Sequence, residues 1–196
     1  VLAAALVSPV LAQSWKYIVM GDMRGDNKPA NVLYVMNPDE SKTGIGFKDK
    51  GITEWALKDL ATAIKNEGPD VVLVVGDLVS KWIPEINGKD ADTLMGEEFA
   101  LWTQIWNQYS GGTPVFPVRG NQEWIASNAK WFEFIQGLPG IGSLHLNGPP
   151  GEEGLSYSFH YKNVLFVAID QYVGAPSADS PTITPAALAW LQEQFV

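Results

Sequence analysis

The sequence contains no cysteine among its 196 residues. This absence excludes disulfide bonds, thiol catalysis and cysteine-ligated zinc. Any metal ion would therefore have to be bound by Asp, Asn or His side chains. The lack of cysteine is compatible with both reducing and oxidising compartments, so it does not decide where the protein acts.

Basic residues are also scarce. There are 13 Lys and Arg against 22 Asp and Glu, which gives a formal net charge of −9 and a pI near 4.6. Binding to a nucleic-acid duplex relies on clustered Lys and Arg that neutralise phosphates, so the composition argues against a nucleic-acid duplex as partner. A small phosphate ester held by a metal ion is compatible with this charge.

The first apolar run, residues 1–12, is too short to span a membrane. It carries no charge, and the small residues near its end suit cleavage after Ala12. We predict that residues 1–12 are the remnant of a signal peptide, that the protein is secreted or periplasmic, and that its natural sequence begins before Val1. A buried N-terminal strand is the alternative.

The rest of the chain, residues 13–196, has the size of one domain with a sizeable core. The sequence is 46% hydrophobic and 18% charged, which is typical of a globular protein. No repeat, heptad pattern or linker divides it. We therefore predict a single α/β domain.

Three apolar runs rich in β-branched residues each end in glycine followed by a polar residue: Gly21-Asp22, Gly76-Asp77 and Gly120-Asn121. Such runs are typical of buried parallel strands. Because the carboxyl ends of parallel strands meet at one edge of a sheet, we expect Asp22, Asp77 and Asn121 to converge. The preceding glycines allow the backbone to turn sharply. One Gly-Asp pair would indicate an ordinary turn or helix cap, but three in order favour a site.

Two carboxylates and an amide oxygen, with no cysteine, are the ligand set of a hard-cation site. A carboxylate shared between two cations offsets their repulsion and allows a metal pair. Such a pair activates water and stabilises the entering and leaving oxygens of a phosphoryl displacement. The predicted cofactors are therefore two divalent metal ions, with Mn, Fe and Zn all open.

Apolar periodicity predicts the remaining elements. We expect helices over 53–65, 91–109, 127–137 and 186–195, and a hairpin of strands 157–161 and 164–169. In the first helix an apolar stripe begins at Trp55 or Ala56, and Gly68-Pro69 closes the helix. The second helix can bury a Trp-rich face, and Thr184-Pro185 forms the N-cap of the last one. The polar segment 26–51 has little periodicity, so it is either a loop that borders a substrate pocket or a variable surface insertion.

The three strand-end motifs also carry a resemblance to a known family. Gly21-Asp22-Met23-Arg24, Gly76-Asp77-Leu78-Val79 and Gly120-Asn121-Gln122-Glu123 resemble the first three motifs of the calcineurin-like metallophosphoesterases, which read Asp-x-His, Gly-Asp-x-x and Gly-Asn-His-Asp/Glu. The run 166–170 and the helix 188–195 are also similar to that family. The resemblance implies an αββα sandwich and a two-metal site. It implies that Asp22 binds the first metal, that Asp77 bridges, and that Asn121 binds the second metal and contacts the substrate.

Two residues depart from the family pattern within these motifs. Arg24 stands where the family has a ligand histidine, and a guanidinium cannot bind a metal but can grip phosphate oxygens. Gln122 stands where the family has the histidine thought to protonate the leaving group, and an amide has no proton to transfer. Glu123 is the alternative proton donor. The predicted catalytic residues are therefore Arg24, Gln122 and Glu123, with Arg24 also binding substrate.

The family's distal histidine and its closing Gly-His-x-His motif are absent from this sequence. The only histidines, His145 and His160, do not match those positions, so we expect them to be structural or exposed. The last predicted helix shows no C-cap. We therefore expect the sequence to be the N-terminal portion of the domain, incomplete at the C-terminus, with little activity on its own.

The leading hypothesis is a metal-dependent hydrolase, a phosphatase or phosphodiesterase, acting on a small phosphate ester or a phosphorylated substrate. The first alternative is a non-catalytic homologue that binds metal or phosphoester, because Arg24 and Gln122 replace histidines. The second is a nucleotide-binding domain without metal, which lacks the glycine-rich loop needed to cradle phosphates. The sequence does not decide the substrate, the metal or the oligomeric state.

Overall fold

A computed structural model of the chain describes residues 14–21, 52–79, 90–141 and 147–195. The predicted signal-peptide remnant, the segment 26–51 and the residues Asp22, Arg24 and His145 lie outside these ranges. Within them, no helix has the length and apolar character needed to cross a membrane.

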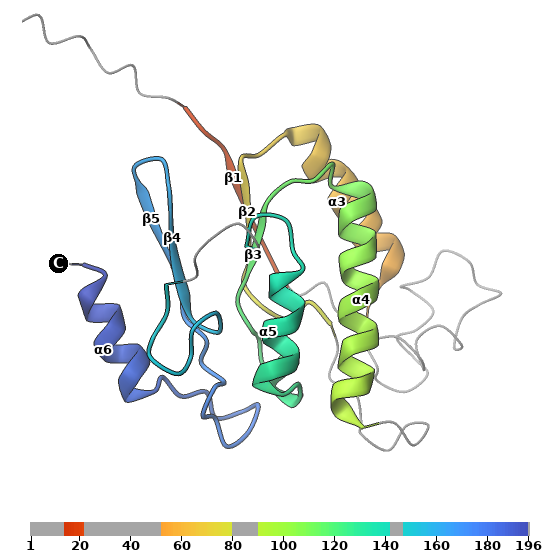
Figure 1. Cartoon of the computed structure of the whole chain (residues 1–196). Coiled ribbons are helices and arrows are strands. Elements are labelled where there is room, and N and C mark those ends of the chain that lie inside the picture. Colours follow the sequence, from red (N-terminus) through yellow and green to blue (C-terminus); the bar gives the residue numbers. More distant parts are fainter. Residues whose placement is uncertain (1–13, 22–51, 80–89, 142–146, 196) are drawn as a thin grey trace, which may run out of the picture.

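The first three strands form a parallel sheet (Figure 1). They are β1 (Tyr17–Met20), β2 (Val71–Val74) and β3 (Val115–Pro117), in that order across the sheet. Tyr17 pairs with Val71 and Val72 pairs with Val115. The β-branched residues of the central strand are buried, as predicted for a parallel strand. The prediction of a buried strand is wrong for β1, which lies at the edge of this sheet: Tyr17 and Val19 are 53% and 52% exposed.

Three helices cover one face of this sheet (Figure 1). They are α3 (Glu54–Glu67), α4 (Ala91–Tyr109) and α5 (Asn128–Gln136). Each predicted helix is confirmed, and side-chain caps at Asp90 and Ser127 begin α4 and α5. The aromatic face predicted for α4 is also confirmed, because the stacked rings of Trp102 and Trp106 are fully buried.

The buried face of α3 is narrower than predicted. Leu57, Ala61 and Ile64 are buried as expected, but Trp55 is 41% exposed. Helical spacing allowed either Trp55 or Ala56 to begin the apolar stripe, and the helix turns Trp55 outward. Gly68 ends the helix with a left-handed φ of 58°, as the Gly-Pro signal predicted.

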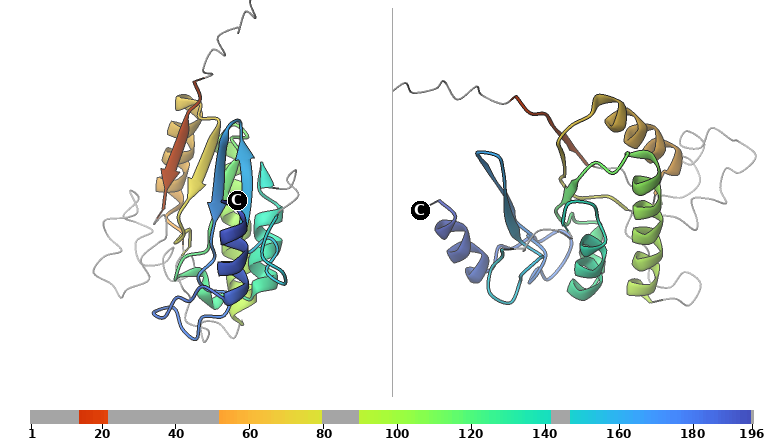
Figure 2. Two further views of the ribbon diagram at one scale, coloured as in Figure 1. Left: turned by 90° about the vertical axis from the view of Figure 1, so that its left-hand side faces the viewer. Right: turned by 45° about the horizontal axis from the view of Figure 1, so that its top comes forward.

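The second half of the chain adds the other two layers. The antiparallel strands β4 (Tyr157–Tyr161) and β5 (Val164–Ala168) form the predicted hairpin, and α6 (Pro185–Glu193) lies outside them. The right-hand view of Figure 2 shows the order α6, hairpin, parallel sheet and the three other helices. This arrangement confirms the predicted αββα fold. His160 lies on β4 and is exposed, as expected.

Aromatic side chains hold the hairpin against β3. The rings of Phe116 and Phe159 stack with centroids 3.9 Å apart, a contact that contributes about 0.5–1.5 kcal/mol beyond its buried area. The buried hydroxyl of Tyr157 donates to the Pro117 carbonyl oxygen over 2.6 Å. These contacts place the carboxyl end of β5 beside the carboxyl ends of β2 and β3.

Candidate functional site

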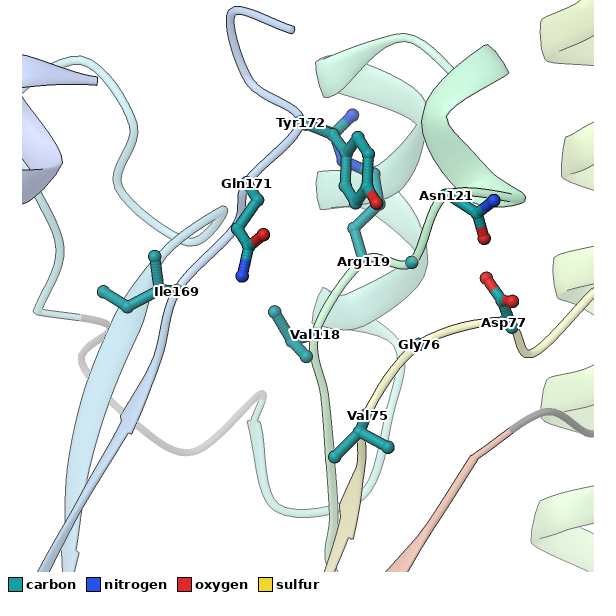
Figure 3. Close-up of a pocket in the computed structure, with 10 residues that line it drawn as sticks. Val75, Gly76, Asp77, Val118, Arg119, Asn121, Ile169, Gln171 and Tyr172 are labelled. Atoms are coloured by element: carbon teal, nitrogen blue, oxygen red, sulfur yellow. The ribbon is translucent and has the colours of Figure 1, made fainter. Parts of the chain in front are cut away.

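The residues that follow β2, β3 and β5 line a pocket of about 350 Å³ (Figure 3). Two of the predicted metal ligands, Asp77 and Asn121, lie in its wall, and their side chains point toward one another. The structure therefore brings these two residues together as the sequence predicted. The third predicted ligand, Asp22, and the predicted phosphate-binding Arg24 lie outside the described residues. The remaining lining residues are Val75, Gly76, Val118, Arg119, Gly120, Ile169, Gln171 and Tyr172.

Two glycines allow the turns after β2 and β3 to touch. A Cβ atom at Gly76 would lie 2.6 Å from the Cα of Gly120, and one at Gly120 would lie 2.4 Å from the backbone nitrogen of Asp77. Gly76 also has a φ of 92°, so the predicted sharp turn is found there. At Gly120 the requirement is close approach between two backbones. Both glycines thus bring Asp77 and Asn121 within one pocket.

Asp77 adopts a backbone conformation that is rare for residues other than glycine. Its φ is 55°, in the left-handed region, which costs on the order of 1–3 kcal/mol and persists only where neighbours enforce it. The Asp77 backbone N–H donates to Glu123 Oε2 over 3.0 Å, and its Oδ1 accepts from the Gln122 backbone N–H over 3.2 Å. The turn after β3 therefore fixes both the backbone and the carboxylate of Asp77.

The buried side chain of Glu123 links the turns after β2 and β3 by hydrogen bonds. Its fully buried carboxylate accepts backbone N–H groups from Asp77, Gly120 and Val79 at 2.9–3.0 Å. Burial raises the pKa of Glu123 to about 7, the Asp77 carboxylate adds to the rise, and the N–H donors oppose it. Glu123 is absent from the described pocket lining. Its predicted role as a proton donor stays a prediction.

Gln122 contributes its backbone to the site. Its N–H binds the Asp77 carboxylate, while its side chain is not among the described groups that line the pocket. Its predicted catalytic role in place of histidine stays a prediction. The structure shows that the residue at this position helps to hold Asp77 in place.

Arg119 and Asp170 form a buried ion pair that the sequence reasoning missed. Arg119 Nη2 lies 2.8 Å from Asp170 Oδ2, and both side chains are at most 1% exposed. Arg119 also donates to Asn128 Oδ1 over 2.9 Å. Burial raises the pKa of Asp170, and the Arg119 guanidinium opposes that rise. The sequence did contain a signal, because a charged residue directly follows an apolar strand twice: Arg119 follows Val118, and Asp170 follows Ile169.

The oxygens of Asp77 and Asn121 are of the hard type that divalent cations such as Mn²⁺ prefer. Within residues 14–21, 52–79, 90–141 and 147–195, no group of three or more His, Asp or Glu side chains converges. The side chains of Asp77 and Asn121 therefore fit part of a cation site. A complete site needs further donors.

Comparison with known proteins gives one assignment. A family model described as calcineurin-like phosphoesterase matches residues 16–192, which includes all three strand-end motifs, the pocket and the second sheet. A comparison with curated protein sequences found no match. On the extent of that family match, together with the αββα layers, the chain belongs to the calcineurin-like phosphoesterase family.

Proposed function

We propose that this protein hydrolyses phosphate esters in the pocket at the ends of β2, β3 and β5, with two divalent metal ions as cofactors. Membership of the calcineurin-like phosphoesterase family supports phosphoester hydrolysis. The observation that carries the proposal for this chain is the pair of facing side chains, Asp77 and Asn121, at adjoining strand ends (Figure 3).

Asp77 and Asn121 would hold the metal ions, with Asp22 as a further proposed ligand. When bound, a metal pair of this kind supplies an activated water and stabilises charge on the oxygens of the phosphoryl group. The ions proposed are Mn, Fe or Zn, because the ligand chemistry does not separate them. Arg24 and Asn121 are proposed to contact the substrate phosphate.

The chain itself preorganises the site. Glu123 binds the backbone of both turns, and the Gln122 N–H holds one carboxylate oxygen of Asp77. Because these contacts are made inside the protein, Asp77 keeps its orientation without reorganisation when substrate arrives. Preorganised groups stabilise developing charge better than mobile ones, so this rigidity favours turnover.

The experiment is hydrolysis of an aryl phosphate by the full-length protein with added Mn²⁺ or Zn²⁺. We expect metal-dependent release of the phenol, with loss on addition of EDTA. Asp77→Asn should reduce the rate to that of the blank, since it removes a charged ligand from the pocket. The matched control is Asp59→Asn on α3, which removes an exposed carboxylate outside the pocket and should keep the wild-type rate. Equal rates for wild type and Asp77→Asn would contradict the proposal.

The proposal extends to location. We propose that the protein is secreted or periplasmic, on the basis of residues 1–12 alone. Fractionation of cells that express the full-length protein should place it outside the cytoplasm, and retention in the cytoplasmic fraction would contradict this.

A further inference from the structure

One wall of the pocket comes from the second sheet. It consists of residues 169–175, which directly follow β5 and which we call the wall segment. Ile169, Gln171 and Tyr172 line the pocket from this segment, opposite the turns that carry Asp77 and Asn121 (Figure 3). In the same view the ring of Tyr172 extends toward the turn that carries Arg119 and Asn121.

Two contacts tie the wall segment to the turn after β3. The first is the buried ion pair between Arg119 and Asp170, 2.8 Å long. The second is the hydrogen bond from Trp124 Nε1 to the Ala175 carbonyl oxygen, 3.0 Å long. The wall segment is thus attached near both of its ends to the residues that flank Asn121.

Asp170 is also bonded directly to the residue that faces the pocket. Its Oδ1 accepts the backbone N–H of Tyr172 over 2.7 Å, while its own N–H donates to the buried Ser156 hydroxyl over 2.9 Å. A continuous chain of contacts therefore runs from Arg119 through Asp170 to the backbone of Tyr172. A buried ion pair is weak evidence for stability, since an apolar pair of the same size often serves as well. What this pair adds is a carboxylate held in place to accept the backbone N–H of Tyr172.

The Tyr172 hydroxyl is suited to donate a hydrogen bond. A tyrosine hydroxyl has an ordinary pKa of about 10, so the group is protonated at neutral pH. The oxygens of a phosphate ester are strong acceptors. A neutral donor in a pocket that also holds carboxylates binds such an oxygen without adding another negative charge.

We propose that Tyr172 contacts an oxygen of the phosphate ester, and that Arg119 and Asp170 are positioning residues that hold Tyr172 opposite Asp77 and Asn121. This inference rests on the proposed function and identifies a substrate contact within it. It assigns a role to the second sheet, which the three strand-end motifs do not include.

The test is a double-mutant cycle on ligand binding. The probe is phenylphosphonate, an aryl phosphate analogue that is not hydrolysed, titrated by calorimetry into the full-length protein with Mn²⁺. Tyr172→Phe should weaken binding about tenfold, as expected for one lost hydrogen bond to a charged acceptor, without changing the thermal unfolding temperature. Asp170→Asn should weaken binding by a similar factor. The double variant should bind no more weakly than either single variant.

Trp124→Phe provides a second route that leaves the buried ion pair intact, in case Asp170→Asn does not fold. It removes the donor to Ala175, and its effect on binding should also vanish in the Tyr172→Phe background. Equal effects of Asp170→Asn or Trp124→Phe in both backgrounds would show a merely structural role and overturn the inference. Unchanged binding by Tyr172→Phe would also overturn it, even if Asp77→Asn abolishes binding and so leaves the proposed function standing. Absence of binding and turnover in the wild type would overturn both.

Discussion

Two carboxylates, one at each end, link the two sheets of the sandwich, and they differ in burial. We call the contacts of the first, Asp170, the buried joint and those of the second, Asp70, the exposed joint. At the pocket end, Asp170 pairs with Arg119 with both side chains at most 1% exposed. At the opposite end, Asp70 accepts the Tyr161 hydroxyl and the Lys16 backbone N–H, and its side chain is 31% exposed. A carboxylate serves at both ends, but the nearest partner of Asp170 is a guanidinium, whereas Asp70 binds neutral donors and is open to solvent.

This difference in burial indicates which end of the sandwich is held more rigidly. Water competes for the contacts of Asp70, and salt screens its ion pair with Lys162, so this exposed joint contributes little to stability. The buried joint leaves an unsatisfied charge when either partner is lost, so it behaves as all or none. The buried joint lies beside the pocket, where Asp170 also accepts the backbone N–H of Tyr172. The exposed joint holds only the far edge of the sandwich.

Breaking the ion pair between Arg119 and Asp170 should reduce the stability of the protein most. Arg119→Ala leaves the Asp170 carboxylate buried without its partner, so we expect a loss of about 3–5 kcal/mol in the free energy of unfolding. Urea denaturation measures this loss. The combined change Arg119→Met with Asp170→Leu should recover most of it, since an apolar pair needs no charge compensation. A loss below about 1 kcal/mol for Arg119→Ala, the value of an exposed pair, would contradict the comparison.

Replacing Glu123, the buried carboxylate that binds the turns after β2 and β3, should reduce the stability of the protein by an intermediate amount. Glu123→Gln replaces one acceptor oxygen by an N–H₂ group, which would face a backbone N–H of Val79 or of Asp77 and Gly120. We expect a loss of about 1–3 kcal/mol, the cost of one buried unsatisfied donor. Chemical denaturation checks it, with the exposed Glu193→Gln as control. A Glu123→Gln protein as stable as its control would argue against the joining role of Glu123.

Acidification should weaken the exposed joint. The Tyr161 hydroxyl, followed by the Lys16 N–H, lowers the pKa of Asp70 below its ordinary value of 3.8. A lowered pKa stabilises the folded protein above the ordinary value, and this stabilisation is lost as the pH falls through the folded value. The stability difference between wild type and Tyr161→Phe should therefore be largest near neutral pH and shrink below about pH 4. A difference that grows on acidification would have the wrong sign.

Much of the fold follows from local pattern. Apolar runs that end in Gly-Asp or Gly-Asn predicted the three parallel strands, and they did so because buried strands leave an unbroken apolar signature. The capping signal Thr184-Pro185 placed the start of α6. The sequence left open whether Trp55 or Ala56 begins the apolar stripe, because helical spacing alone does not fix the edge of a stripe; Trp55 is exposed.

The site was predictable only in part. Asp77 and Asn121 follow from strand ends, since topology brings such ends together. The pairing of Arg119 with Asp170 did not follow, because it depends on how the second sheet packs on the first, which no local pattern encodes. The contacts that Glu123 makes did not follow from the sequence either, for a similar reason. Its partners are backbone N–H groups of a turn distant in the chain, and backbone groups carry no sequence signal.

The central claim is that oxygens of Asp77 and Asn121 belong to one divalent-cation site. The most direct measurement is Mn²⁺ binding to the metal-free full-length protein, followed by electron paramagnetic resonance. The account predicts that Asp77→Asn and Asn121→Ala each weaken or abolish binding, while the exposed control Asp59→Asn binds like wild type. Wild-type Mn²⁺ affinity in both pocket variants would contradict it.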